Sequence, residues 1–345
     1  MEKASVRNGI DVLLERQGAD LRGMRVGLIT NPSGVTAGLE SAIDALRRCP
    51  GLSLVALFAP EHGLSASVAD GQPFASATDR RTGLPIYSLY SGAGKRPRPE
   101  MLRGLDALLL DIQDVGARFY TFISTMVEAM AAAAESGLGF VVLDRPNPIT
   151  GTIQEGPILD QAFQSFVGCH NIPIRHGLTM GELARLVNGE RGLGARLAVI
   201  PLAGWRREMW FDETGLPWVP PSPAMPSLET AILYPGMCLI EGSNLSEGRG
   251  TALPFQIVGA PWVDGYALAE SLNRLDLPGV RFRPTQFRPA DSKWAGQLCE
   301  GVQVHVRDRQ SFRAVRTALH IIAAIRQMYP QQFTWCERHF DLLMG

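Results

Sequence analysis

Polar and charged side chains gather directly after four apolar runs in the first half of the chain. Glu61 and His62 follow one of these runs, and Asp111 and Asp144 follow two others. Two carboxylates in one cleft suit glycoside cleavage, because one protonates the leaving oxygen while the other supports water or the sugar cation. The candidate site residues of this group are Asn31, Glu61, His62, Asp111, Asp114, Arg118, Asp144, Arg145 and Asn147.

A second candidate group lies in residues 241–251, where glycines free the backbone and charged side chains crowd a short loop. Its candidates are Asn244, Glu247 and Arg249, and a separate segment before a helix adds His176. The segment Lys95-Arg96-Pro97-Arg98 is most simply a solvated loop, although it could also attract an anionic substrate. Structural roles stay open for all of these residues, because turns, helix caps and internal ion pairs use the same residue types.

Several classes of function are disfavoured by composition and by absent motifs. Lys plus Arg number 33 against 34 for Asp plus Glu, so the basic excess that marks nucleic-acid binders is missing. No G-x-G-x-x-G, P-loop, H-E-x-x-H or G-x-S-x-G motif is present. The five cysteines are scattered without a C-x-x-C, which argues against a disulfide framework and a zinc site. We therefore expect neither a cofactor nor a metal, and no nucleic-acid partner.

The elements that must position these residues alternate between apolar runs and helical patterns. Helices are expected near residues 39–48, 119–135 and 180–188, and this alternation predicts a Rossmann-like α/β fold with a doubly wound parallel sheet. Since ligands bind beyond the carboxyl ends of such strands, the polar groups should meet at one edge of the sheet. The expected strands are Arg25–Thr30, Leu52–Phe58, Leu84–Leu89, Ala107–Leu110, Gly139–Leu143 and Leu197–Pro201.

The sequence pattern changes from about Trp205, where Pro and Gly become frequent and the alternation of strands and helices weakens. Helices near residues 266–273 and 312–328, with strands near 280–282 and 302–306, predict a second, smaller α+β domain. We place the first domain at residues 1–210 and the second at 211–345, with the boundary anywhere in 200–235. No stretch reaches the ~18 apolar residues of a membrane span, and the N-terminus lacks an apolar signal core, so we expect a cytoplasmic protein.

Long motifs in a fixed order give the chain a resemblance to a known family. They include GLITNPSG (27–34), LFAPEHG (57–63), DIQDVGARFYTFISTM (111–126), VVLDRPNPITG (141–151), IPIRHGLTMGELA (172–184) and EGSNLSEGRGTALPF (241–255). On these motifs the chain resembles the NamZ-like exo-β-N-acetylmuramidases, a bacterial family of glycoside hydrolases. One departure is Ala224, which stands where the family usually has Asn.

The resemblance implies a Rossmann-like domain, a smaller C-terminal domain and a cleft between them. It also implies release of N-acetylmuramic acid from the non-reducing end of peptidoglycan fragments, so the expected partner is a muramic-acid disaccharide or muropeptide. Tyr120 joins the candidate site residues on the motif DIQDVGARFYT. A non-catalytic muropeptide-binding protein, and a nucleotide- or phosphate-using enzyme suggested by the sheet alone, are the alternatives.

Within this interpretation Glu61 is the expected general acid/base. Asp111, Asp114 and Glu247 form the remaining acidic group, unranked, and the stereochemical outcome stays open because it depends on the carboxylate separation. Muramic acid differs from N-acetylglucosamine by a lactyl ether that carries a carboxylate, so selectivity needs a cation, and arginine binds a carboxylate with two parallel bonds. The candidates for this role are Arg118, Arg145 and Arg249, with Arg249 and Arg118 preferred.

Overall fold

A computed structural model describes residues 6–69, 71–91 and 94–345 of the chain. Its contacts divide the chain into two compact units. The first unit comprises Met1–Gly116, Tyr120–Thr152 and Gly177–Pro226, and the second comprises Ala117–Phe119, Ile153–His176 and Ser227–Gly345. A domain boundary after residue 210 stays a prediction.

The first unit is built on a seven-stranded sheet with the strand order β3-β4-β2-β1-β5-β6-β9. All neighbouring strands are parallel except β3 and β4, so the predicted parallel sheet is confirmed, with one antiparallel edge strand that was not expected. Leaving that edge strand aside, the order is the one found in Rossmann-type sheets, with the chain reversing its winding direction between β1 and β5. The strands are β1 (Arg25–Thr30), β2 (Ser53–Ala59), β3 (Ala77–Thr78), β4 (Pro85–Ser88), β5 (Ala107–Asp111), β6 (Gly139–Leu143) and β9 (Arg196–Ile200).

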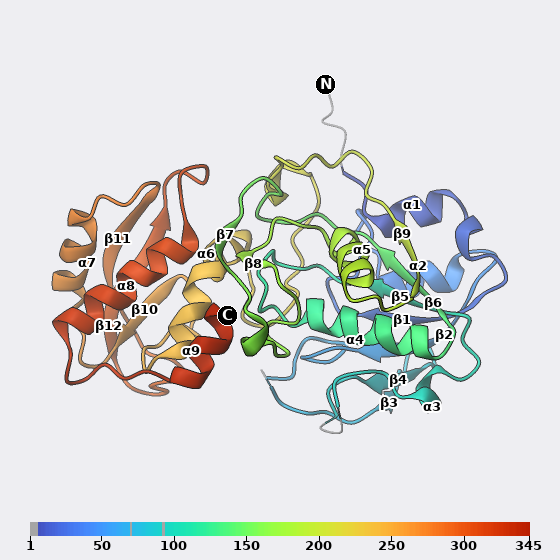
Figure 1. The fold of residues 1–345 in the computed structure, drawn as a ribbon, viewed down its shortest axis with the longest axis horizontal. Coiled ribbons are helices and arrows are strands. Elements are labelled where there is room, and N and C mark those ends of the chain that lie inside the picture. The colour runs from blue at the N-terminus through green and yellow to red at the C-terminus, as the bar shows by residue number, and fades with distance from the viewer. Residues whose placement is uncertain (1–5, 70, 92–93) are drawn as a thin grey trace. The chain divides into compact units, whose positions relative to one another are not determined.

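Helices cover this sheet on both faces (Figure 1). Helices α1 and α2 contact each other, with α1 on β6 and β9 and α2 on β2, while α4 and α5 form a second pair on β5, β6 and β9. Burial on both faces explains why β5 is an unbroken apolar run rather than an alternating one. The helices of this unit are α1 (Gly9–Glu15), α2 (Ala42–Arg48), α3 (Pro99–Leu102), α4 (Phe122–Glu135) and α5 (Met180–Glu190), with 3-10 turns η1 (Ala19–Leu21) and η3 (Phe211–Glu213).

The second unit contains the antiparallel sheet β10-β12-β11 and the hairpin pair β7 and β8. This confirms a smaller part with antiparallel strands, although β7, β8, β10, α6 and α9 were not predicted. Its strands are β7 (Glu155–Ile158), β8 (Pro173–Arg175), β10 (Ile257–Ala260), β11 (Val280–Phe287) and β12 (Cys299–Val306). Its helices are α6 (Leu228–Met237), α7 (Gly265–Arg274), α8 (Ala314–Met328) and α9 (Glu337–Met344), with 3-10 turns η2 (Gln161–Phe163) and η4 (Cys238–Gly242).

Helix α6 forms in spite of Pro235 and Gly236 near its end, because it packs closely on α8. A Cβ atom on Gly236 would lie 1.9 Å from the carbonyl oxygen of Ala314, the first residue of α8. Only glycine allows the two backbones to approach this closely. Tertiary packing therefore decides the structure here against local helix propensity.

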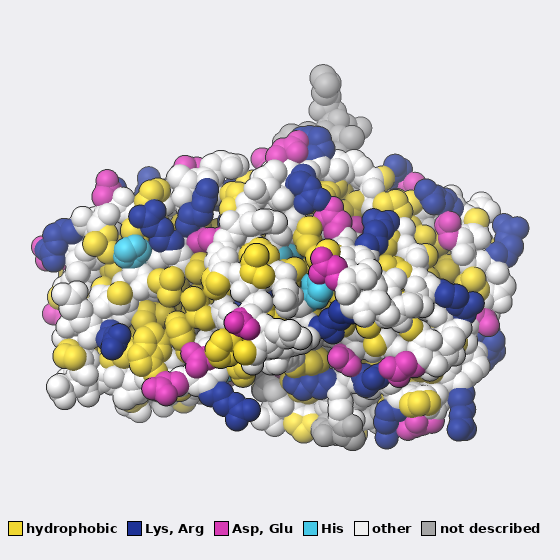
Figure 2. Space-filling view, in the orientation of Figure 1, with side chains coloured by type: hydrophobic (Ala, Val, Ile, Leu, Met, Phe, Trp, Pro, Cys, Tyr) yellow, Lys and Arg dark blue, Asp and Glu magenta, His cyan; other side chains and the backbone are white. Residues whose placement is uncertain are grey.

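The visible surface carries acidic and basic side chains side by side rather than in one large basic field (Figure 2). This distribution matches the net charge of −1. In the described part of the chain no helix is long and apolar enough to cross a bilayer.

Candidate active site

The carboxyl ends of β5 and β6 are joined by a buried ion pair. Arg145 donates from Nε to Asp111 Oδ1 at 2.7 Å and from Nη2 to Asp111 Oδ2 at 2.9 Å. The Asp111 side chain is 0% exposed and that of Arg145 is 4% exposed. Burial raises the pKa of the Asp111 carboxyl, and the Arg145 charge opposes that shift. The bidentate geometry gives both residues a structural role at the point where β1, β5 and β6 end.

Asp144 anchors the start of α5. Its carboxylate accepts hydrogen bonds from the Gly181 backbone at 2.8 Å and from the Thr179 hydroxyl at 2.9 Å. A Cβ atom on Gly181 would lie 2.7 Å from the Asp144 carboxylate, so glycine permits this approach. Burial raises the pKa of Asp144 to about 6, against the opposing effect of these hydrogen bonds.

Amide side chains complete the polar layer at this edge of the sheet. Asn31 accepts from the Ser33 hydroxyl at 2.6 Å and donates to the Pro221 carbonyl at 2.8 Å. Asn147 donates to the Leu178 carbonyl at 3.0 Å and accepts from the Ile149 backbone. These bonds tie loops together, as turn-forming residues do.

Asp114, three residues after Asp111 in the sequence, is buried and forms part of a turn. Its Oδ2 atom accepts from the backbone of Gly116 at 2.7 Å, and Gly116 has the positive φ of 81° that such a turn requires. Tyr120 is buried and its ring packs edge-on against Phe122, with centroids 4.8 Å apart.

Glu61 lies just beyond β2, and two neutral groups hold its carboxylate. The Thr121 hydroxyl donates to Oε2 at 2.6 Å, and the Gly71 backbone donates to Oε1 at 2.9 Å. Thr121 is the residue at which α4 begins, so the carboxylate also lies at the positive end of that helix. Glu61 is 7% exposed, and among the described residues no cation forms a direct ion pair with it. Its orientation is therefore fixed without neutralising its charge.

His62 turns the chain away from β2 with a positive φ of 70°. Its ring Nδ1 atom lies 2.9 Å from the Val68 carbonyl oxygen. Because a carbonyl oxygen can only accept, Nδ1 carries the proton of this bond, and Nε2 is the acceptor in the neutral ring. His62 thus closes the loop that carries Glu61.

The second unit holds a separate cluster of charges around Arg249. Its guanidinium lies 2.9 Å from a Glu241 oxygen and 3.6 Å from a Glu247 oxygen. Glu247 also pairs with Lys293 at 3.1 Å, and Glu241 lies 3.4 Å from His339. The Arg249 guanidinium carbon sits 4.9 Å from the ring centroid of Phe255.

Environment drives the two carboxyl pKa values of this cluster apart. Burial would raise the pKa of Glu241, but Arg249 and His339 together lower it to about 2. Burial, with a contribution from the Glu241 charge, raises the pKa of Glu247 against the opposing effect of Lys293. A low and a raised carboxyl pKa side by side are the arrangement that acid–base catalysis uses, although internal ion-pair networks produce it as well.

Three other predicted site residues have structural contacts within the second unit. Arg118 is 1% exposed, and its two terminal nitrogens donate to four backbone carbonyls, those of Pro157, Ile172, Leu343 and Met344. Asn244 exchanges hydrogen bonds with the backbone of residues 332 and 334. His176 is fully buried. These contacts favour a structural role for Arg118.

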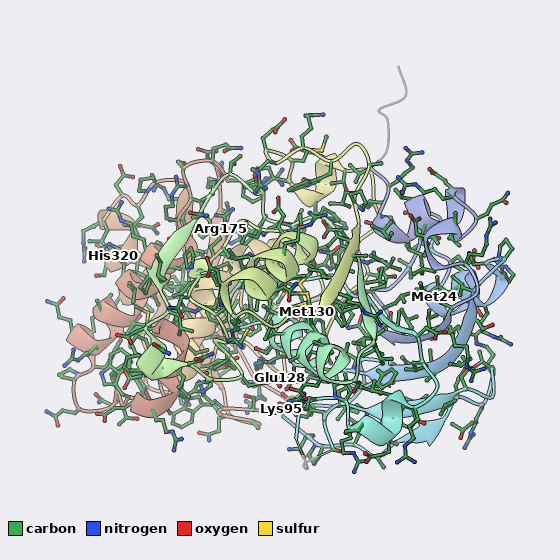
Figure 3. All side chains as sticks on the ribbon, turned by 45° about the vertical axis from the view of Figure 1, so that its right-hand side comes forward. Met24, Lys95, Glu128, Met130, Arg175 and His320 are labelled. Atoms are coloured by element: carbon green, nitrogen blue, oxygen red, sulfur yellow. The ribbon has the colours of Figure 1, made fainter. Side chains whose placement is uncertain are left out.

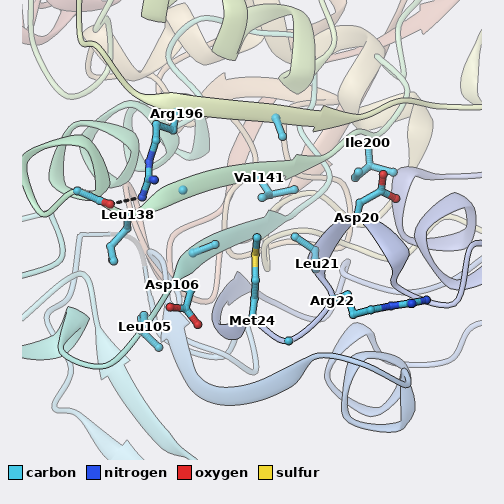
Figure 4. A pocket seen from close by; sticks show the side chains of 15 residues that line it. Asp20, Leu21, Arg22, Met24, Leu105, Asp106, Leu138, Val141, Arg196 and Ile200 are labelled. Carbon is cyan, nitrogen blue, oxygen red and sulfur yellow. Dashed lines mark hydrogen bonds between the residues drawn. The ribbon is translucent and has the colours of Figure 1, made fainter.

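A pocket in the first unit lies at the opposite edge of the sheet. It measures about 680 Å³ and opens where Met24, Asp106, Leu138 and Arg196 stand at the amino ends of β1, β5, β6 and β9 (Figure 4). Its floor is apolar, with Leu21, Ala107, Val141 and Ile200 among its lining residues. Ligands of doubly wound sheets bind at the carboxyl ends of the strands, which is the edge that carries Glu61 and not the edge with this pocket.

Sequence reasoning missed three residues that shape these surroundings. Thr121 holds Glu61, Lys293 pairs with Glu247, and the charge of Glu61 acts on the pKa of Lys95. Lys293 stands between Ser292 and Trp294, both with positive φ, in a loop that carried no recognisable motif. The basic segment 95–98 was noticed, but nothing in the sequence connected it with Glu61.

The strand order and the buried polar layer at the carboxyl edge define a Rossmann-type α/β protein. Comparison with known proteins makes the assignment specific. The model for the N-terminal domain of exo-β-N-acetylmuramidase NamZ matches residues 26–229, and that for its C-terminal domain matches residues 232–345. The chain belongs to the NamZ family of exo-β-N-acetylmuramidases.

Individual relatives agree with this assignment. The peptidoglycan β-N-acetylmuramidase NamZ of Bacillus subtilis (strain 168) is 50% identical over 345 residues, which are 100% of this chain and 83% of that protein. A DUF1343 family protein from Bacteroides fragilis NCTC 9343 has a similar crystal structure, with a TM-score of 0.92 and 42% identity over 99% of this chain and 89% of that one. A second B. fragilis protein of that family gives a TM-score of 0.77 and 31% identity over 99% and 88%.

Proposed function

We propose that this protein is an exo-acting glycoside hydrolase that releases N-acetylmuramic acid from the non-reducing end of peptidoglycan fragments in cell-wall turnover. Membership of the NamZ family supports this activity, and the B. subtilis relative is named for β-N-acetylmuramidase activity on peptidoglycan. The substrate is a disaccharide or muropeptide with muramic acid at its non-reducing end. A cytoplasmic location stays a prediction, which fractionation of producing cells would test.

The observation that carries the catalytic assignment is the setting of Glu61. Its carboxyl group is nearly buried and is held by Thr121 and Gly71 through neutral hydrogen bonds. A general acid must take up and release a proton. A carboxyl group held by neutral partners can do so without first breaking an ion pair. In the proposed reaction Glu61 protonates the glycosidic oxygen as the bond to the muramic acid carbon breaks, and it later takes a proton from water.

The bidentate pair with Arg145 favours a structural role for Asp111, so we remove it from the catalytic set. Asp114 and Glu247 keep the predicted role of second carboxylate. The second carboxylate acts in its ionised form, so the raised pKa of Glu247 weighs against that role, and the Asp114 bond to Gly116 favours a turn.

The test is the activity of Glu61→Gln on a chromogenic β-glycoside of N-acetylmuramic acid. The amide keeps the size of the side chain and removes its proton, so turnover should fall by at least about 100-fold at unchanged melting temperature. Glu135→Gln is the matched control, because Glu135 is an exposed acid that pairs with Arg96 at the surface. Asp114→Asn and Glu247→Gln, assayed in parallel, identify the second carboxylate.

A well-folded Glu61→Gln protein with wild-type turnover would remove Glu61 from the mechanism. The alternative of a muropeptide-binding protein without activity predicts tight binding of the same glycoside and no release of chromophore by the wild type. The enzyme assay therefore separates the two functions directly.

A further inference from the structure

Strand pairing brings the residues after β2 and β4 together beside Glu61. The two strands are parallel, with Ala59 opposite Ser88, and the Leu89 backbone donates to the Ala59 carbonyl at 2.9 Å. Glu61 and Tyr90 each stand two residues beyond this last pair. Paired strands are about 4.8 Å apart, so this register makes Tyr90 and Glu61 follow neighbouring strands at the same edge of the sheet.

Lys95 lies over the ring of Tyr90. Its Nζ atom is 4.4 Å from the ring centroid, a distance at which an ammonium is attracted to the π face. Lys95 belongs to the segment between β4 and α3, and Figure 3 marks its side chain there. The side chain is half-buried, while Tyr90 below it is buried. The aromatic ring therefore limits the positions that this ammonium can take.

Electrostatics connect Lys95 with the proposed acid/base. Partial burial lowers the pKa of Lys95, and the Glu61 carboxylate opposes that shift, so the two charges act on each other. A cation in partly desolvated surroundings binds a carboxylate more strongly than one in bulk water. The direct contacts of Glu61 are nevertheless with Thr121 and Gly71.

The arginines predicted to bind the lactyl carboxylate have other contacts. Arg118 donates to four carbonyls and Arg145 to Asp111, while Arg249 lies between Glu241 and Glu247. Binding a ligand carboxylate would require each of them to give up such contacts. The selectivity that muramic acid demands therefore points to a cation elsewhere.

We propose that Lys95, oriented by the Tyr90 ring, forms a carboxylate subsite beside Glu61 that binds the lactyl group of N-acetylmuramic acid. This inference rests on the proposed function, in which Glu61 cleaves the glycoside next to that sugar. The subsite distinguishes muramic acid from N-acetylglucosamine by a charge that only the former carries. It also places the glycosidic bond of the bound sugar on the side of Glu61.

The test compares two chromogenic glycosides, one of N-acetylmuramic acid and one of its lactyl methyl ester, which has no charge. For Lys95→Met, kcat/KM on the acid should fall about 10- to 100-fold, the range of one charge-assisted hydrogen bond. On the methyl ester it should stay at the wild-type value. Lys95→Arg should recover most of the loss on the acid. Arg98→Met is the matched control, since Arg98 is an exposed cation paired with Glu100 at 3.1 Å.

An equal loss on both glycosides, with a shifted pH profile, would overturn the subsite and assign Lys95 to tuning Glu61 instead. An unchanged selectivity would overturn it as well. If the wild type cleaves neither glycoside, the proposed function fails, and calorimetric titration with free N-acetylmuramic acid decides the subsite alone. Weaker binding to Lys95→Met than to wild type then supports the subsite, and equal binding refutes it.

Discussion

Replacing Asp111 by Asn should destabilise the first unit rather than remove a catalytic group. Asp111 and Arg145 are 0% and 4% exposed and share two hydrogen bonds of 2.7 and 2.9 Å. Asn keeps the shape of the side chain but leaves the guanidinium charge buried without its counter-ion. Removing one partner of a buried pair in this way costs about 3–5 kcal/mol.

This loss of unfolding free energy corresponds to a lower melting temperature. For domains of 150–250 residues, 1 kcal/mol corresponds to about 2–4 °C, so Asp111→Asn should melt about 6–20 °C below the wild type. Differential scanning calorimetry measures this directly. The double variant Asp111→Leu, Arg145→Met removes both charges and should regain part of the loss, because buried pairs can be replaced by apolar groups at little cost.

Turnover of folded Asp111→Asn, measured well below its melting temperature, should stay within about tenfold of the wild type, because Asp111 contacts no reacting group in this interpretation. A variant with unchanged melting temperature and a loss of about 100-fold or more in turnover would refute the reasoning. Asp111 would then be the second carboxylate, and its bonds to Arg145 would orient it for catalysis.

Two further predictions concern the second unit. Glu241→Gln should lower the free energy of unfolding by about 2–3 kcal/mol at pH 7, because Arg249 and His339 depress the pKa of Glu241 from 4.5 to about 2. The loss in unfolding free energy relative to the wild type should be full above pH 4.5 and should vanish as the pH falls through 2. Denaturant titrations across this pH range would measure it. Arg118→Met should speed amide hydrogen exchange in α9 without changing the preference for the muramic over the glucosamine glycoside, and a changed preference would return Arg118 to the substrate site.

The strands of the first unit could be predicted closely because burial on both faces leaves a strong mark on a sequence. β1 and β6 were predicted at their observed bounds, and β5 was one residue short. Helix α6 was missed because Pro235 and Gly236 indicate a helix end locally. What overrides them is contact with α8, a partner far along the chain, and no local pattern reports such a contact.

The position of Glu61 could be predicted for the same reason, since a residue directly after a buried parallel strand must lie at the carboxyl edge of the sheet. Its partners could not. Thr121 is 60 residues away in sequence and reaches Glu61 through the fold, at the start of α4. Tyr90 follows the strand next to that of Glu61 because β2 pairs with β4, and the sequence does not specify this pairing.

The choice of the substrate-binding cation shows why residue type alone misleads. A guanidinium in the protein interior needs acceptors for its donors, and the protein itself supplies them, as the carbonyls around Arg118 and the carboxylate of Asp111 do. The more deeply an arginine is buried at a conspicuous motif, the more of its donors are already used. A cation that binds a ligand must instead remain partly exposed to solvent. Its orientation then has to come from a neighbouring side chain, such as the ring of Tyr90. Lys95 meets both conditions, in a segment whose composition is most simply that of a solvated loop but could also attract an anionic substrate.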